Sequence, residues 1–184
     1  MSMFEWAFRA AQEKLAESLP NRWAHVQGVA RQARALRPIS GADSELLEAA
    51  AILHDVGYSP DLVRTGFHPL DGAYFLQDAG APARLVHLVA HHSCAAHEAR
   101  LRGLAEEVGQ FHDEQGSIRD GLWFCDLTTA PDGQEVDARA RMDEIKQRYG
   151  AGHVVTRFIT EAREELLGAV DRTRSRLETA SHPK

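Results

Sequence analysis

Apolar residues recur at spacings of three and four along most of the chain, and no stretch alternates regularly between apolar and polar residues. The first pattern is typical of helices that bury one face, whereas alternation would indicate strands. The sequence therefore predicts an all-α protein that folds as a single-domain helical bundle. The predicted helices cover residues 3–18, 22–36, 43–55, 69–79, 82–92, 98–111, 117–129, 135–149 and 152–179.

Breaks between these helices fall at glycine and proline residues, which interrupt regular structure. Pro20 precedes the second predicted helix, and Gly57 with Pro60 follows the third. Asp43 is suited to cap the third helix at its N-terminus, and Pro69 to occupy the first turn of the fourth.

The composition is that of a globular protein with a sizeable core, because 43% of the residues are hydrophobic and 26% are charged. A length of 184 residues fits one domain. The formal net charge of −6 argues against a broad basic surface for nucleic acid, although a metal site can still attract a small phosphorylated molecule. The sequence has no run of about 18 apolar residues that could span a membrane and no signal-peptide pattern at its start, so we expect a cytoplasmic protein.

Cysteine and large aromatic residues are expected to be structural. Cys94 and Cys125 form no CxxC pair, and we expect both to be buried or half-buried free thiols. Trp23, Trp123 and Phe67 are expected in the core or at its rim, and Phe67 is also a candidate to flank a bound base.

One stretch, AAILHDVGYSP at 49–59, ends an apolar helix with the polar doublet His54-Asp55. Burying such side chains without partners costs several kcal/mol, so a bound ion or a hydrogen-bond network is expected there. A second doublet, His112-Asp113, lies in the polar stretch QFHDEQGS and is expected at the surface.

Other polar residues also interrupt apolar helical segments. His25 lies along the edge of an apolar face, His68 precedes a helix-starting proline, and His91 with His92 ends the apolar run LVHLVA. Asp126 stands inside LWFCDL, although aspartate is a poor residue for the middle of a helix. Imidazoles and carboxylates together suit Zn, Mn, Fe, Co or Ni, and one carboxylate can bridge two such ions.

This ordered set resembles the HD superfamily of metal-dependent phosphohydrolases, whose name describes the doublet seen here as His54-Asp55. The minimal family pattern would correspond to His25, His54, Asp55 and Asp126. The resemblance covers about residues 20–130, and the predicted helices over 135–179 lie outside it. It implies a bundle of the HD-domain type across 1–184.

Two further histidine elements resemble the binuclear branches of the superfamily. His68 in HPLDGA is similar to their HPxxGA element, and His91-His92 to the histidine element that follows it. By this resemblance one ion takes the minimal set, and Asp55 bridges to a second ion held by His68 and by His91 or His92. The choice between the two adjacent histidines stays open.

The sequence also departs from the pattern. Tyr58 follows the HDxG element where the HD-GYP cyclic-dinucleotide enzymes carry lysine, and no GYP triplet occurs, which argues against their activity. Arg22 matches a position that is often basic in the diadenosine-tetraphosphate hydrolases, where it would bind phosphate or orient Asp55; an exposed arginine at a helix start is the alternative. Arg64 and Lys146 are weaker candidates for phosphate binding.

The resemblance implies hydrolysis of a phosphoester or phosphoanhydride, with a nucleotide as the expected substrate, by water activated on one or two divalent ions of Fe, Mn, Ni, Co or Zn. Asp55, Asp126 and His92 are the catalytic candidates, and His87 or His91 is an alternative proton relay. Two other functions stay open: a di-iron oxygenase of the same fold and a non-catalytic nucleotide-binding module. We expect a small phosphorylated partner, no nucleic acid and no membrane, and the sequence leaves homo-oligomer formation open.

Overall fold

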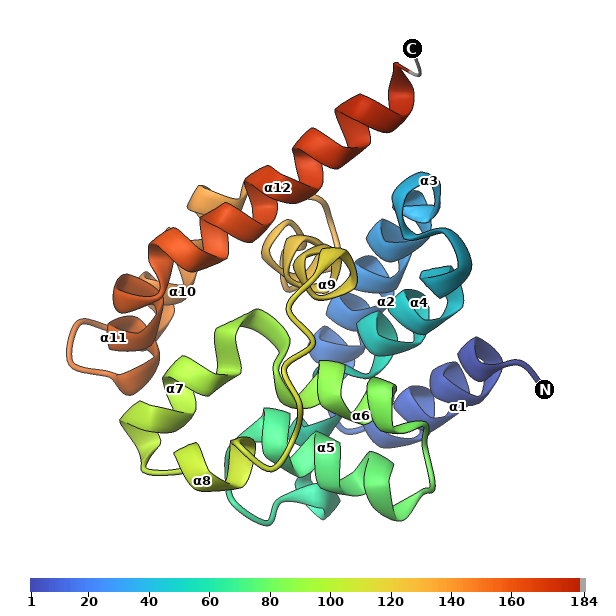
Figure 1. Ribbon diagram of the computed structural model, residues 1–184. Coiled ribbons are helices and arrows are strands. Elements are labelled where there is room, and N and C mark those ends of the chain that lie inside the picture. Colours follow the sequence, from blue (N-terminus) through green and yellow to red (C-terminus); the bar gives the residue numbers. More distant parts are fainter. Residues whose placement is uncertain (183–184) are drawn as a thin grey trace.

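The computed structural model describes residues 1–182, which fold into helices joined by short loops (Figure 1). No β-strand occurs among these residues, and their β-pairing is limited to an isolated bridge between Thr129 and Glu135. The prediction of an all-α protein is confirmed. The α-helices are α1 (Met3–Leu15), α2 (Pro20–Ala35), α3 (Arg37–Ser40), α4 (Ser44–Leu53), α5 (His68–Asp78), α6 (Ala83–Ala90), α7 (Ala95–Arg102), α8 (Ala105–Val108), α9 (Ser117–Leu127), α10 (Ala138–Tyr149), α11 (Val154–Glu161) and α12 (Arg163–Ser181).

Several predicted boundaries were wrong for identifiable reasons. The single helix expected over 98–111 is divided into α7 and α8, because Gly103 adopts a left-handed conformation with φ 75° and ends α7. The helix expected over 152–179 is divided at Ala162 into α11 and α12. Pro20 begins α2 rather than separating helices, since the first turn of a helix needs no N–H from proline. Asp43 does not cap α4 with its side chain; its carboxylate accepts hydrogen bonds from Arg84 instead.

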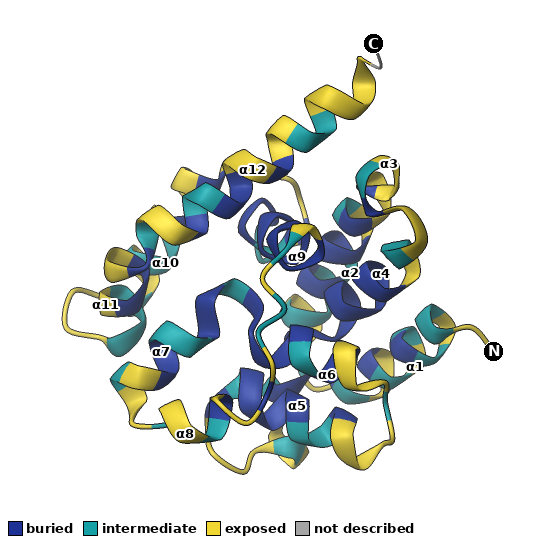
Figure 2. Cartoon of the chain, viewed as in Figure 1, coloured by how far each residue is buried: buried dark blue, intermediate teal, exposed yellow. Residues whose placement is uncertain are grey.

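Helix α4 lies in the middle of the fold. Its residues from Leu46 to Leu53 are all buried, and it packs against α1, α2, α6 and α9 (Figure 2). The small side chains of Ala49, Ala50 and Ala51 let neighbouring helices approach closely. Because α4 ends at Leu53, His54 and Asp55, which follow it directly, lie in the interior of the bundle.

The C-terminal helices cover one side of this core. The long helix α12 runs across α9, while α10 and α11 lie together near its beginning (Figure 1). Buried Asp120 of α9 accepts hydrogen bonds from Arg172 and Arg176, which joins α12 to the core by ion pairs. Helix α10 also contacts α9, so the C-terminal helices reach the helix that carries Asp126.

The structure also tests the expectations for the cysteines and the large aromatic residues. Cys94 and Cys125 are both buried free thiols, as predicted. Trp123 and Phe67 are also buried, which excludes Phe67 as a residue that stacks on a bound base. Among the helices described, none has both the length and the apolar composition needed to cross a membrane.

Candidate metal centre

After the doublet the chain packs closely against the start of α5, and a glycine makes this approach possible. His54 follows the last residue of α4, and Asp55 precedes the short 3-10 helix η2 (Val56–Tyr58). A Cβ atom on Gly57 would lie 2.1 Å from the carbonyl oxygen of His68, closer than any real contact allows. Only glycine therefore lets η2 pack against the start of α5, which brings His68 beside Asp55.

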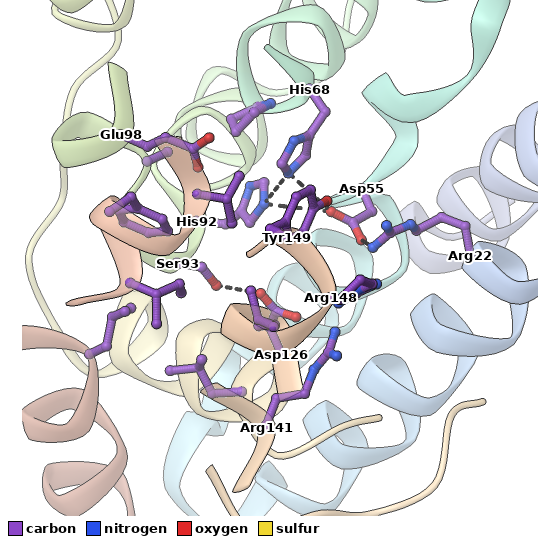
Figure 3. Close-up of a pocket in the computed structure, with 18 residues that line it drawn as sticks. Arg22, Asp55, His68, His92, Ser93, Glu98, Asp126, Arg141, Arg148 and Tyr149 are labelled. Carbon is purple, nitrogen blue, oxygen red and sulfur yellow. Dashed lines mark hydrogen bonds and ion pairs between the residues drawn. The ribbon is translucent and has the colours of Figure 1, made fainter. Parts of the chain in front are cut away.

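The other polar residues of the cluster come from four separate elements. His25 lies on α2, His68 begins α5, His92 begins the 3-10 helix η4 (His92–Cys94) after α6, and Asp126 lies near the end of α9. The imidazoles converge on Asp55, as Figure 3 shows for His68 and His92, which line the pocket together with Asp126. The structure thus brings together residues separated by as many as 101 positions in the sequence.

The two carboxylate oxygens of Asp55 face two different pairs of histidines. Oδ2 lies 3.4 Å from Nε2 of His54 and 3.8 Å from Nε2 of His25. Oδ1 lies 3.2 Å from Nε2 of His68 and 3.7 Å from Nε2 of His92. A carboxylate placed between two such donor pairs has the arrangement needed to bridge two metal ions.

Asp126 completes the group on the Oδ2 side. Its Oδ1 atom lies 3.1 Å from Nε2 of His25 and 3.7 Å from Nε2 of His54. Two overlapping triads, His25 with His54 and Asp126, and His54 with Asp55 and His92, each offer donor atoms that all lie within 4.8 Å of one another.

Backbone carbonyls fix the orientation of three of the imidazoles. Nδ1 of His25, His54 and His92 lies 3.1, 2.8 and 2.7 Å from the carbonyl oxygens of Ala130, Ala51 and Val89 respectively. An Nδ1–H that donates to a carbonyl leaves the Nε2 lone pair free to face the cluster. Nε2 of His54 is buried and has no hydrogen-bond partner among the described residues. This orphaned nitrogen and the surrounding donor set fit a divalent transition-metal ion.

Comparison with protein families finds a match to the HD domain over residues 22–123, more than half of the chain. The chain belongs to the HD domain family. The matched region contains His25, His54, Asp55, His68 and His92, while Asp126 and the C-terminal helices lie beyond it. No curated protein and no solved structure matches the chain significantly.

The carboxylates of this HD-domain cluster are held in the ionised form. Burial alone would raise the pKa of Asp55, but the charges of Arg22 and His54 outweigh it and hold the pKa well below its usual range. Burial opposes ionisation of Asp126 in the same way, and His54 and His25 hold its pKa well below the usual range too. Both side chains are therefore negative at neutral pH and attract cations.

The histidines differ in how readily they take up a proton. Burial lowers the pKa of His54, yet the charges of Asp55 and Asp126 raise it to about 10. Burial and the neighbouring His54 and His68 lower the pKa of His92 to about 3. Because only a neutral imidazole can bind a metal through Nε2, an ion entering the cluster must displace the proton of His54.

Arg22 forms an ion pair with Asp55, and Tyr58 packs against Arg22. Nη1 of Arg22 lies 2.5 Å from Oδ2 of Asp55, and its guanidinium group lies over the Tyr58 ring at 4.1 Å. The Tyr58 ring stacks in turn on His68 with ring centroids 3.9 Å apart. Arg22 therefore pairs with Asp55 and also lines the pocket, so its position is compatible with both roles considered from the sequence.

Ser93 is a residue of the site that sequence reasoning missed. Its Oγ donates a short hydrogen bond to Oδ2 of Asp126. Ser93 and the following Cys94 both have left-handed backbones, with φ of 46° and 62°, which costs energy in residues other than glycine. The signal in the sequence was the position of Ser93 directly after the histidine pair.

Other candidates point away from the cluster. Nε2 of His91 lies 2.8 Å from the carbonyl oxygen of Phe111, so the structure brings His92 and not His91 to Asp55. His87 lies near Phe111 and His112 instead of the cluster. In the second doublet, Asp113 forms an ion pair with Arg119.

The weaker phosphate candidates are also elsewhere. Arg64 forms an ion pair with Asp78, and Lys146 forms one with Asp143. Neither residue lines the pocket above the cluster.

The cluster opens into a pocket with a cavity volume of about 90 Å³. Arg22, Asp55, His68, His92 and Asp126 lie at one side of it. We call the part of the lining contributed by α10 and α11 the roof. The roof residues are Arg141, Ile145, Arg148, Tyr149, Val155, Phe158 and Ile159.

Sequence reasoning did not single out the roof, because its residues belong to ordinary amphipathic helices. Two of them are arginines, so the wall that faces the metal-binding side chains carries positive charge.

Proposed function

We propose that this HD-domain protein is a metal-dependent phosphohydrolase that cleaves a phosphoester or phosphoanhydride bond of a nucleotide. One observation carries the proposal: the two oxygens of Asp55 face separate pairs of imidazoles. An ordinary hydrogen-bond network has no need of this symmetry, whereas a carboxylate between two sets of donors can bridge the ions of a two-metal hydrolytic site.

The proposed ligands divide into two sets that share Asp55. His25, His54 and Asp126 would hold one ion together with Asp55, and His68 and His92 would hold the other. Fe, Mn, Ni, Co and Zn all suit imidazole and carboxylate donors. His91 is left out of the proposed set because its Nε2 is engaged by the carbonyl of Phe111.

Bound divalent ions would lower the pKa of a water molecule and neutralise charge on the phosphoryl group. Arg22 keeps Asp55 ionised and fixed in orientation. Asp126 is the proposed proton acceptor, because 18% of its side chain is exposed in the pocket, compared with 5% for Asp55. Ser93 holds Oδ2 of Asp126 in place during that transfer.

The charge of the pocket supports a phosphorylated substrate. Three arginines, Arg22, Arg141 and Arg148, line it together with three acids, Asp55, Glu98 and Asp126, so bound divalent cations would make its walls positive although the whole chain carries a net charge of −6. A concave site with positive walls concentrates anions of small size without binding nucleic acid broadly. Because α10, α11 and α12 contribute to the same pocket as the family-matched helices, the proposal treats the described chain as one domain.

The proposal is tested by metal analysis of the purified protein, followed by a screen of phosphomonoesters, nucleotides and dinucleoside polyphosphates with and without chelator. We expect bound transition metal and chelator-sensitive phosphate release from one substrate class. His54→Ala should abolish both, while His112→Ala, in the second His-Asp doublet, should leave both unchanged.

Two outcomes would contradict the hydrolase. Protein with two irons that consumes O2 with a small organic substrate and leaves every phosphoester intact would be an oxygenase. Protein that binds a nucleotide but turns over none of the substrates, with metal present, would be a binding module.

A further inference from the structure

Arg141 in the roof is buried in a way that calls for an additional partner. Its side chain is only 6% exposed, it lines the pocket, and its Nε atom has no hydrogen-bond partner among the described residues. A guanidinium group removed from water is stable only when its donors are satisfied. Arg141 thus brings a buried, incompletely paired guanidinium group to the wall of the pocket.

The charges around Arg141 do not balance. Arg148 lies seven residues later on α10, two turns along the same face, and also lines the pocket. Glu144 pairs with both arginines, so one carboxylate serves two guanidinium groups. Both arginines line the same pocket as Asp126 (Figure 3). The roof thus carries an excess positive charge that faces the cluster.

An apolar wall adjoins these arginines. Ile145, Phe158 and Ile159 line the same pocket, and the Tyr149 ring lies next to Arg148 with the guanidinium carbon 5.4 Å from its centroid. This combination suits a ligand with an anionic part and a planar apolar part. In Figure 3 Arg141 lies toward the Asp126 end of the pocket and His68 toward the other end, so an anion held by Arg141 would be separate from one held beside His68.

We propose that the roof binds a second, non-scissile phosphate, so that the substrate is an organic di- or polyphosphate with a planar apolar body. This inference rests on the proposed function, and it selects phosphoanhydrides over simple monoesters. The terminal phosphate faces the His-Asp cluster, Arg141 and Arg148 bind the phosphate next to it, and the apolar wall takes the body.

The reaction that follows is hydrolysis of the terminal anhydride bond. The oxygen of water forms a new bond to the terminal phosphorus, and the bond from that phosphorus to the bridging oxygen breaks. The electron pair stays with the bridging oxygen on the organic phosphate, and the proton of water passes to Asp126. Arg141 stabilises the negative charge that develops on the departing phosphate.

Calorimetric titration of the metal-loaded protein tests the inference with two probes that differ by one phosphate group. The probes are adenosine 5′-monophosphate and adenosine 5′-(α,β-methylene)diphosphate, which cannot be hydrolysed between its phosphorus atoms. Arg141→Met should raise the Kd of the diphosphate probe about 10- to 100-fold, the value of a charge-assisted hydrogen bond, and the Kd of the monophosphate less than about threefold. Arg148→Met, at a half-exposed position, should shift the diphosphate Kd in the same direction and serves if Arg141→Met does not fold.

Arg139→Met is the matched control, because Arg139 is exposed on the same helix and does not line the pocket. Equal weakening of both probes by Arg141→Met and Arg148→Met, or none, would overturn the inference even if the protein hydrolyses phosphoesters. A selective loss of diphosphate binding in a protein that hydrolyses nothing would support the roof site and refute the proposed function alone.

Discussion

The hydroxyl of Ser93 donates a hydrogen bond to Oδ2 of Asp126, and it reaches that oxygen from a left-handed backbone. Strain of this kind costs on the order of 1–3 kcal/mol and persists where the surrounding structure enforces it. The strained residue, Ser93, directly follows the proposed metal ligand His92 and binds the proposed proton acceptor, Asp126. The relationship indicates that the turn after His92 serves to position Asp126.

Ser93→Ala should therefore lower kcat about tenfold with little change in KM, the effect of losing one hydrogen bond to a charged group. Ser93→Gly should lower kcat equally, yet keep or increase the free energy of unfolding, because glycine adopts the left-handed conformation without strain. Steady-state kinetics and chemical denaturation of both variants check this. Unchanged kcat in both would remove Ser93 from the catalytic account.

Gly57→Ala should disrupt the site through backbone packing. The new Cβ would meet the His68 carbonyl at 2.1 Å, so η2 and the start of α5 must separate. We expect a loss of about 2–4 kcal/mol in the free energy of unfolding and weaker metal binding on the His68 side. Denaturation and metal stoichiometry measure the two effects. Gly152→Ala is the control, since a Cβ there meets nothing within 4 Å; equal effects in both variants would contradict the packing argument.

Metal affinity should depend on pH through His54. Its pKa of about 10 means that the metal-free protein carries a proton there at neutral pH, and binding must release it. The apparent Kd for metal should therefore fall about tenfold for each unit of pH rise between roughly pH 6 and 9. His92, with its pKa lowered to about 3, releases no proton in this range. Competition with a coloured chelator gives the slope, and a pH-independent Kd would refute the assignment.

The attachment of α12 should weaken in acid. Burial opposes ionisation of Asp120, but its hydrogen bonds from Arg172 and Arg176 lower the pKa below the ordinary value. The stabilisation is therefore fully present above the unfolded-state pKa of about 4 and is lost as pH falls through the lower folded-state pKa.

Asp120→Asn should reduce the free energy of unfolding by about 2 kcal/mol at pH 7, and this difference should shrink below about pH 4. Urea denaturation across pH measures it. Asp132→Asn, at an exposed loop position, is the control and should change stability little. A difference from wild type that stays constant down to pH 2 would contradict the ion-pair account.

The helical class was readable from the sequence because each helix buries one face, and that requirement imposes a spacing of three and four on its apolar residues. The members of the cluster were readable for a related reason. His54, Asp55 and Asp126 interrupt apolar segments, and a buried polar residue is costly unless something compensates for it. These are local properties of the chain, and the HD domain match agrees with them.

Tertiary structure alone decided the rest. Whether His91 or His92 faces Asp55 depends on the 3-10 turn after α6, which directs one ring to the cluster and the other to the Phe111 carbonyl. Arg141 and Arg148 look like any arginines on an amphipathic helix until α10 is laid over the pocket. The sequence by itself determined which side chains are too polar for their surroundings, because that cost is local. Packing decided which of these side chains contact one another, because such contacts depend on the positions of helices that are distant in the sequence.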